Sequence, residues 1–425
     1  MNVLHNSAIK ECTSCQMCGA VCHSNAISIH LDNDGFYRPY IEDDKCTDCG
    51  QCVNVCYKFD KIIPKTSDTE LDQSITLYAA TAKDNEIVSN TTSGGIADLF
   101  AKQLIEDGYK VIGVAYDYTT NRAKHQIATT IEETIPFRGS KYIQSYSMDA
   151  FRELVKECSK QPFAIFGLPC QIYATSKYLN KKGVRKQCIL LDLYCHGCPT
   201  MHLWDKNIAH FQKKMGTDKF DNVCFRSKIK GWGNFVVEVK QGKRSYHSMP
   251  LHNEFFDLFF SDQVLNVSCS NCELRSTLSY TDIRLGDFWG KQYKKNFRGV
   301  SGVTLVSDNA KVLFSKIIPY IDYKKESFSS FLPYQSWGKT YTINPSLRNK
   351  LMKFLNDKDK NIDETIEPIL ERRTFKRKAI VLFKQILFNF PPRLYFATRR
   401  LLSIVFLKVT EKSHNNTNNS TKILF

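Results

Sequence analysis

The chain has 425 residues, 42% of them hydrophobic and 12% aromatic, which is enough for about two to four domains with sizeable cores. Its net charge of +16 is common among nucleic-acid-binding proteins, but ten of its cations lie between Arg372 and Lys408, a segment without Asp or Glu. Without those ten charges the chain carries only +6, and no nucleic-acid-binding module accompanies the basic segment. We therefore expect no nucleic-acid partner.

The N-terminus and the cysteines indicate a reducing compartment. The opening residues, MNVLHNSAIKECTSC, contain no apolar segment of the kind found in a signal peptide. Many of the 16 cysteines cluster at C-x₂-C spacing, which favours metal or redox chemistry over a disulfide framework. The sequence therefore predicts a cytoplasmic protein.

Two cysteine runs dominate residues 1–65. CTSCQMCGAVC begins at Cys12 and CTDCGQCVNVC begins at Cys46, and both have the spacing C-x₂-C-x₂-C-x₃-C. Between them, AISIHL and YRPYI read as two strands joined through DNDG, whose residues tolerate the left-handed conformations of a hairpin turn. In this spacing, three cysteines hold one four-iron cluster and the fourth reaches across to a second cluster.

The repeated spacing predicts two [4Fe–4S] clusters with crossed ligation. We expect one cluster to be held by Cys12, Cys15, Cys18 and Cys56. We expect the other to be held by Cys46, Cys49, Cys52 and Cys22. The alternative is a pair of zinc knuckles, although structural zinc sites are usually built from two separated cysteine pairs. The unit resembles the bacterial dicluster ferredoxins, but His23 and Tyr57 stand where those proteins usually have a proline after the fourth cysteine.

After a polar linker, the chain alternates between strand and helix patterns. Buried strands are predicted at ITLYAATA, KVIGVAYD, FAIFGLPC and CILLDLYC, and helices at SGGIADLFAKQLIEDG and DAFRELVKECSK. This alternation predicts a mixed α/β domain with a largely parallel sheet. Residues 220–250 have the pattern of antiparallel strands, and GVTLVS with NAKVLFSKIIPYI continues the α/β pattern.

Four further motifs occur in an order typical of one family. They are RGSKYIQS, FGLPCQI, YCHGCPT and CSNCELRSTLSYTDIRLGDFWG. With the helix start TTSGGIADLF, they resemble the coenzyme F420 hydrogenase/dehydrogenase beta-subunit family over about residues 77–306. The resemblance implies an iron–sulfur flavoprotein that binds FAD and passes electrons between clusters, flavin and a reducible partner.

The same resemblance assigns a flavin site. It places the FAD phosphates at Ser93, Gly94 and Gly95, and the flavin beside Ser140, Lys141 and Tyr142. A helix N-terminus and a lysine suit a pyrophosphate. The alternative is a capped helix without a ligand, with Lys141 solvated. The resemblance assigns no catalytic residue.

A second group of thiols suggests a third [4Fe–4S] cluster beside the flavin. The candidate ligands are Cys170, Cys195, Cys269 and Cys272, of which the first two are predicted to lie at strand ends. Cys198 is an alternative to Cys195. A buried structural thiol at Cys170, with the C-x₂-C pair as a zinc half-site or redox pair, is the other interpretation.

The basic segment at residues 372–408 reads as two helices broken by Pro391 and Pro392. Its apolar runs are shorter than the ~20 residues that a membrane-spanning helix needs. Two interpretations stay open: an amphipathic arm on the inner face of an anionic membrane, or a helical cap packed on the enzyme. Residues 321–371 are an extension between the α/β domain (76–320) and this arm, and residues 409–425 are predicted to be disordered.

These patterns predict an α+β protein with a ferredoxin-like dicluster domain, a mixed α/β flavin-binding domain and a basic helical arm. The expected function is that of an oxidoreductase in which electrons pass from two N-terminal clusters to FAD and then to an unidentified substrate or carrier. Reduced ferredoxin or a flavin-type carrier is the expected donor. The competing hypothesis is an electron-relay subunit whose substrate site lies on another polypeptide.

Overall fold

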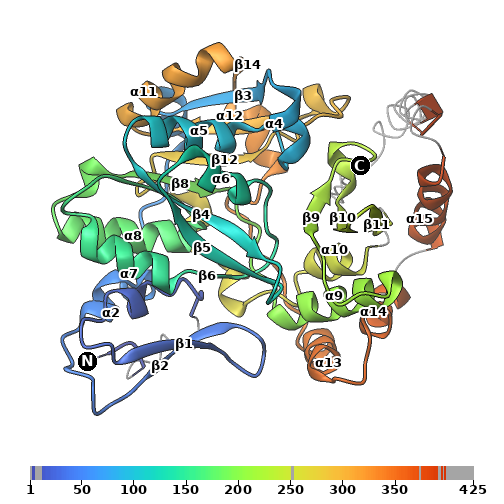
Figure 1. The fold of residues 1–425 in the computed structure, drawn as a ribbon, viewed down its shortest axis with the longest axis horizontal. Coiled ribbons are helices and arrows are strands. Elements are labelled where there is room, and N and C mark those ends of the chain that lie inside the picture. The colour runs from blue at the N-terminus through green and yellow to red at the C-terminus, as the bar shows by residue number, and fades with distance from the viewer. Residues whose placement is uncertain are drawn as a thin grey trace.

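The structure is a computed structural model that describes residues 2–4, 12–249, 253–372, 375–390, 394–395 and 397–398. Figure 1 shows a large sheet flanked by helices, the N-terminal unit below it, and a smaller sheet with its own helices to one side. The predicted fold class, a mixed α/β chain with an N-terminal ferredoxin-like domain, is confirmed.

The N-terminal unit is built around a hairpin and two cysteine-bearing helices. Its elements are α1 (Met17–Ala20), β1 (Ile27–Leu31), β2 (Tyr37–Ile41), α2 (Gln51–Val55) and the 3-10 helix η2 (Tyr57–Phe59). The predicted hairpin is present, with Ile27 opposite Ile41. Gly35 has a φ of 76° in the turn, a conformation that glycine adopts without strain.

Among the described residues, nine strands form the main sheet. Their order is β14 (Ile321–Glu326), β3 (Thr76–Ala82), β13 (Ser301–Leu305), β12 (Ile283–Asp287), β8 (Ile189–Leu193), β7 (Phe163–Phe166), β4 (Lys110–Asp117), β5 (Arg122–Ala128) and β6 (Ser145–Tyr146). The expectation of a largely parallel sheet is wrong. Pairing is parallel from β12 through β8 and β7 to β4, but antiparallel for β4–β5 and from β12 through β13 and β3 to β14. The reason is that the β4–β5 hairpin and the strands on the far side of β12 reverse the chain direction.

Both faces of the main sheet are covered. On β4, Val111 faces one core with α4 (Asn85–Asn90), α5 (Ile96–Glu106) and α11 (Asp308–Ile317). The next residue, Ile112, faces the opposite core with α7 (Met148–Glu157), α8 (Pro169–Lys181) and the N-terminal unit. This alternation follows from the two-residue period of a strand. Short helices in the connections are α3 (Asp68–Gln73), α6 (Ile131–Thr134) and α12 (Phe328–Phe331).

The smaller sheet is antiparallel, as predicted for residues 220–250. Its order is β11 (Arg244–His247), β10 (Val236–Gln241) and β9 (Asn222–Ser227). It shares a core with α9 (Met201–Met215), α10 (Glu254–Phe259), α13 (Pro345–Asn356) and α14 (Ile362–Glu371). Trp204 of α9 stacks on Phe225 of β9 with 4.3 Å between ring centroids, which ties the helices to the sheet.

The basic arm is described in part, as α15 (Phe375–Phe388). Leu387 and Phe388 at its end are buried against Val236 of β10, whereas Leu382, Phe383 and Ile386 are exposed. The second predicted helix lies mostly, and the predicted disordered tail entirely, outside the described residues. Within the described ranges, no helix has the length and apolarity needed to cross a membrane.

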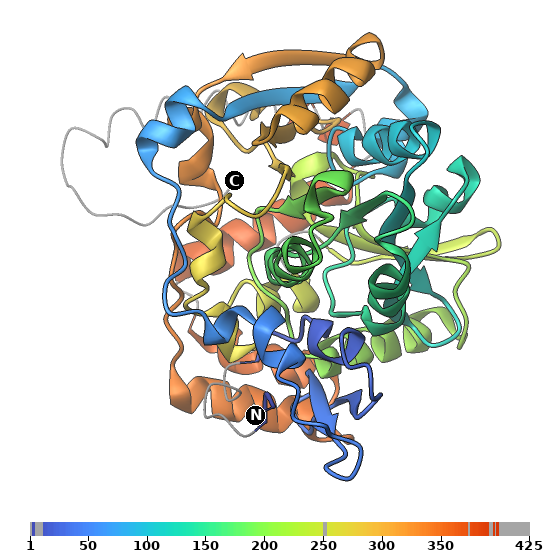
Figure 2. The same ribbon diagram turned by 90° about the vertical axis from the view of Figure 1, so that its left-hand side faces the viewer.

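Buried hydrogen bonds join the N-terminal unit to the main domain. The Gln16 side-chain amide donates to the Ser145 carbonyl at 2.8 Å and accepts from the Ser147 backbone N–H at 2.7 Å. The Asn266 amide donates to the Cys12 carbonyl at 3.0 Å. Figure 2 shows the N-terminal unit, in blue, directly under the green helices of the main domain. The cysteine runs are therefore held at a fixed position against α7 and α8.

Candidate functional site

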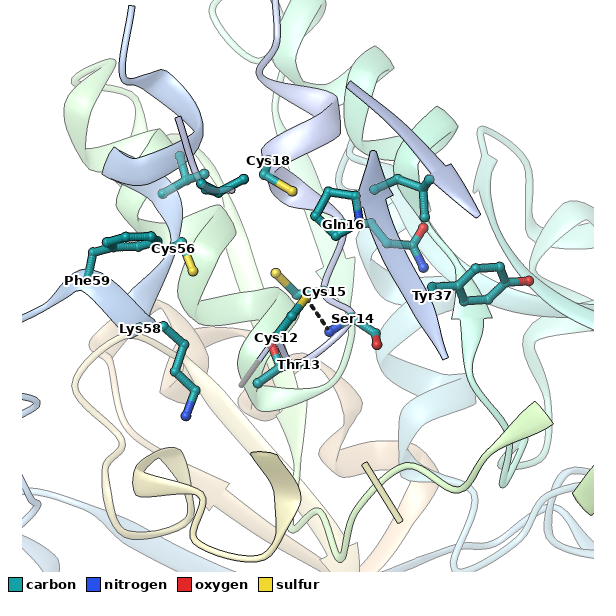
Figure 3. Close-up of a pocket in the computed structure, with 14 residues that line it drawn as sticks. Cys12, Thr13, Ser14, Cys15, Gln16, Cys18, Tyr37, Cys56, Lys58 and Phe59 are labelled. Atoms are coloured by element: carbon teal, nitrogen blue, oxygen red, sulfur yellow. Dashed lines mark hydrogen bonds between the residues drawn. The ribbon is translucent and has the colours of Figure 1, made fainter. Parts of the chain in front are cut away.

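A hollow in the N-terminal unit brings together one predicted set of cysteines. Its lining includes Cys12, Cys15, Cys18 and Cys56. Their sulfur atoms point into the same space, and the Ser14 backbone N–H donates to Cys12 Sγ at 3.4 Å (Figure 3). The space between atoms in this hollow, part of it open to solvent, is about 520 Å³, and apolar side chains such as Val55 and Ile29 line the rest.

A second hollow brings together the other predicted set. Its lining includes Cys22, Cys46, Cys49 and Cys52. Polar groups approach three of these sulfurs. Asn2 donates to Cys46 Sγ at 3.6 Å, Ser24 lies 3.6 Å from Cys22 Sγ, and His23 Nδ1 lies 3.9 Å from Cys49 Sγ. Each hollow thus takes three cysteines from one run and the fourth from the other run.

Burial raises the pKa of three thiols in the first hollow, those of Cys15, Cys18 and Cys56. Burial raises the pKa of Cys15 to about 12, helped by the charges of Cys56 and Cys12. Burial also raises the pKa of Cys56 to about 11. Thiolates are the form that binds metal, so loading this hollow with iron must release protons. Across the part of the chain that is described, no three His, Cys, Asp or Glu side chains converge closely enough to hold a single metal ion.

The third predicted thiol group gathers behind the first hollow. Burial raises the pKa of Cys170, and the next contributions come from Cys15, Cys198, Cys195 and Cys272. Cys195 is likewise affected by Cys269 and Cys272. Cys198 belongs to the same group, because its backbone N–H donates to the sulfur of Cys269. The group therefore includes both alternatives, Cys195 and Cys198.

The predicted location of Cys170 is wrong. It lies in the first turn of α8 rather than at the end of a strand, because β7 ends at Phe166 and Pro169 begins the helix. Proline is favoured at that position, since its fixed φ suits the first turn. Cys195 does follow a strand, β8, as predicted. Cys15 of the first hollow is close enough to raise the pKa of Cys170 in the third group, and both pack against the same core, so the two sites are neighbours.

The two segments predicted to hold FAD lie side by side. The Ser140 backbone N–H donates to Thr92 Oγ1 at 2.7 Å. Ser93 donates its hydroxyl to the Val300 carbonyl at 2.9 Å, and Gly95, with a φ of 85°, precedes α5. Gly94 has no room for a side chain, because a Cβ would lie 2.3 Å from the Ala80 carbonyl oxygen. The sheet therefore requires Gly94 whether or not a ligand binds.

The polar atoms of Lys141 and Tyr142 bond to groups other than those that join at that junction. Lys141 Nζ donates to the carbonyls of Pro136 and Arg138, both at 2.9 Å, and burial lowers its pKa to about 7. The Tyr142 hydroxyl accepts a hydrogen bond from Arg226 at 3.1 Å. Lys141 is half-buried and its ammonium group is held by carbonyls of its own loop, so its place in a flavin site stays a prediction.

Sequence reasoning missed two basic side chains near the predicted flavin segments, the half-buried Lys228 and the buried Arg226. Lys228 Nζ donates to the carbonyls of Val88 and Ser93, both at 2.6 Å, and burial lowers its pKa to about 7. Arg226 pairs with Asp287 and lies over the Trp289 ring at 4.9 Å. Both follow from long-range packing of the smaller sheet on the main one, and no local motif in the sequence marks them.

Comparisons with known proteins agree with this arrangement. Residues 77–152 match the sequence model described as coenzyme F420 hydrogenase/dehydrogenase, beta subunit N-term, and residues 161–328 match the one for its C terminus. The chain belongs to this family. Residues 11–58 match a 4Fe-4S dicluster domain, which covers both cysteine runs of this F420 hydrogenase/dehydrogenase beta-subunit family member.

Two individual proteins are similar to this family member. The coenzyme F420 hydrogenase subunit beta of Methanococcus voltae is 32% identical over 179 residues, which are 39% of this chain and 59% of that protein. The chain thus spans less than two thirds of the length of this relative. A chain of the F420-reducing [NiFe] hydrogenase complex from Methanosarcina barkeri, in a xenon-derivatised structure, is 20% identical with a TM-score of 0.46, covering 73% of this chain and 96% of that one.

Proposed function

We propose that the protein is an iron–sulfur flavoprotein oxidoreductase in which electrons pass between the N-terminal unit and a flavin in the α/β domain. The observation that carries this proposal is the arrangement of the thiols. Each predicted set of four lines its own hollow, and the first hollow adjoins the third group through Cys15 and Cys170. Bound four-iron clusters supply one-electron exchange, and bound FAD links it to two-electron chemistry.

The chain's own residues would hold and shield these groups. Cys12, Cys15, Cys18 and Cys56 would bind one cluster, with the Ser14 backbone N–H donating to a ligand sulfur. Apolar side chains around the hollow exclude water and so help to set the potential. The second set would bind another cluster nearer the surface, where Cys49 is exposed and accessible to an electron donor. Reduced ferredoxin or a flavin-type carrier fits that role.

FAD is proposed for the junction between Thr92–Gly95 and Ser140. The support is that this junction joins a helix start to a second backbone segment, with the Lys228 amino group donating to the Ser93 carbonyl behind it. A pyrophosphate suits free amide groups at the start of a helix. Ser140 is exposed, so the proposed phosphate side is open to an incoming ligand.

A second candidate function is an electron-relay subunit without a substrate site of its own. It is favoured by the name of the Methanococcus voltae relative, which is a hydrogenase subunit. The purified chain distinguishes the two candidates. A relay takes up electrons from a chemical reductant yet oxidises or reduces no small molecule, whereas an oxidoreductase turns over at least one nicotinamide, deazaflavin or organic acceptor.

The arm is proposed to bind the surface of an anionic membrane. Its exposed residues Leu382, Phe383 and Ile386 would enter the interface, while the surrounding cations contact lipid headgroups. This contact would place the enzyme peripherally on the inner face of the membrane.

Metal analysis of anaerobically purified protein tests the main proposal. We expect about eight iron atoms per chain from the N-terminal unit and about twelve with the third site. A double variant, Cys46→Ser with Cys49→Ser, should remove about four of them, and Cys269→Ser with Cys272→Ser should remove another four. Cys158→Ser is the matched control, because this buried thiol of the α7 C-terminus lies outside all three groups. Native protein that contains zinc in place of iron would refute the proposal.

A further inference from the structure

Tyr57 has a buried hydroxyl group without a hydrogen-bond partner. It directly follows Cys56, at the position where dicluster ferredoxins usually have proline, and only 2% of its surface is exposed. None of the described residues donates a hydrogen bond to its hydroxyl oxygen or accepts one from it. A buried unsatisfied polar group costs about 1–3 kcal/mol, so such a group calls for a specific explanation.

Packing fixes the Tyr57 ring. Tyr173 meets it edge to face with 5.8 Å between ring centroids, and Lys58 Nζ lies 5.1 Å from its centroid. Tyr173 itself is held by a hydrogen bond from its hydroxyl to Asp60 at 2.8 Å. The Tyr57 ring also belongs to the core that α7 and α8 form on the sheet. The hydroxyl therefore cannot turn toward solvent to find a partner.

Cysteines of both thiol groups, Cys15, Cys170 and Cys272, pack against the core that contains Tyr57. Apart from burial, the electrostatic effects on Tyr57 come from Cys272, Cys170 and Cys269 of the third group, in that order, and then from Cys15 of the first hollow. A tyrosine hydroxyl can donate one hydrogen bond, and a metal-bound thiolate is an acceptor. Tyr57 thus offers an unused donor in the core against which cysteines of both sites pack.

We propose that Tyr57 is a positioning residue that donates a hydrogen bond to a ligand sulfur of the third iron–sulfur site. This sulfur lies on the side of the third site that faces Cys15. This inference rests on the proposed third cluster. The hydrogen bond stabilises the more negative, reduced form of that site and raises its reduction potential. The tyrosine keeps its proton and its electrons throughout. Its effect is to set the driving force for the electron step between the first hollow and the third group.

The test compares Tyr57→Phe with a matched control, Tyr178→Phe. Tyr178 belongs to the same core and is buried, but its hydroxyl donates to the Val155 carbonyl at 3.1 Å, away from the thiol groups. Redox titration followed by electron paramagnetic resonance measures the potential of each cluster. We expect Tyr57→Phe to lower the ratio of reduced to oxidised third site about tenfold at a fixed potential, which equals a shift of about 59 mV for one electron. Tyr178→Phe and the cluster in the second hollow should not change.

Electron–nuclear double resonance supplies a second measurement. In the wild-type protein, the unpaired electron of the reduced third site should show a hyperfine coupling to the Tyr57 hydroxyl proton, which disappears after exchange into D₂O. This coupling should be missing in Tyr57→Phe. Iron content separates the possible failures. About eight iron atoms in the wild-type protein would refute the third cluster and this inference with it. About twelve in both proteins, with the same potentials and the same exchangeable proton, would refute the role of Tyr57 and leave the proposed function intact.

Discussion

His125 of β5 is a buried histidine far from water. Its side chain is 2% exposed, neither ring nitrogen has a hydrogen-bond partner of normal geometry, and the ring packs against Phe151 at 5.3 Å. Burial lowers its pKa from 6.5 to about 4, and the Phe166 backbone offsets only part of this effect. The unfolded chain therefore binds a proton more readily than the folded chain between those two pH values.

This difference makes the stability of the protein depend on pH. The contribution of neutral His125 is complete above pH 6.5 and is lost as the pH falls toward 4. At pH 5.5 we expect a loss of about 1 kcal/mol relative to pH 7.5, and the loss should vanish in His125→Phe. Urea unfolding of both proteins at the two pH values measures it. The same pH dependence in the variant would assign the effect to another group.

Ser140 offers a probe of the flavin site that Gly94 does not, since its exposed side chain has room to be replaced. Ser140→Asp places a negative charge at the proposed pyrophosphate position. We expect FAD affinity to fall roughly tenfold, equal to about 1.4 kcal/mol, while iron content stays the same. Ser346→Asp is the control, because Ser346 is exposed in the first turn of α13. Equal FAD binding by both variants in a fluorescence titration would place the flavin elsewhere.

At the scale of elements, α15 divides its apolar residues between two environments. Phe388 is 2% exposed and packs on the smaller sheet, whereas Phe383 and Ile386 are 44% and 52% exposed. Lys230 also donates to the carbonyl of Phe390, which anchors the end of the helix. One end of the arm is therefore a packed cap, and its middle presents an apolar stripe.

The two parts of α15 should respond differently to substitution. Phe383→Ser with Ile386→Ser should weaken binding to anionic vesicles and leave unfolding unchanged, because these side chains touch little of the protein. Phe388→Ala should instead lower the unfolding free energy by about 3 kcal/mol. Val312→Ser, at a 57% exposed position of α11, is the control for vesicle sedimentation. If wild-type protein ignores anionic vesicles at low salt, the membrane proposal is wrong.

Sequence reasoning succeeded where local spacing determines structure. The turn residues around Gly35 and the repeated cysteine runs each act over a few residues, so the hairpin and the two groups of four thiols could be predicted. It failed where distant segments decide. β5, RAKHQIA, pairs with β4 in an antiparallel manner, but its charged residues do not give the sequence pattern of a buried strand. The burial of Lys228 depends on hydrogen bonds to residues 135 and 140 positions away in the chain.

At the scale of the whole molecule, the N-terminal unit is packed into the main domain rather than attached as a tethered module. Gln16 is buried and satisfies backbone groups of Ser145 and Ser147, and Ser147 donates its hydroxyl to the Cys15 carbonyl at 3.2 Å. Separating the two parts would break these buried hydrogen bonds, and the cost of breaking them opposes movement of the N-terminal unit away from the main domain. The first hollow and the third thiol group therefore keep a constant separation.

That docking has a kinetic consequence. Electron transfer from the N-terminal unit to the α/β domain would be unimolecular, with a rate that is independent of protein concentration and of solvent viscosity. Encounter with a diffusing donor at the second hollow would instead be bimolecular and sensitive to ionic strength. As the donor concentration rises, the observed rate would level off at the value set within a single molecule.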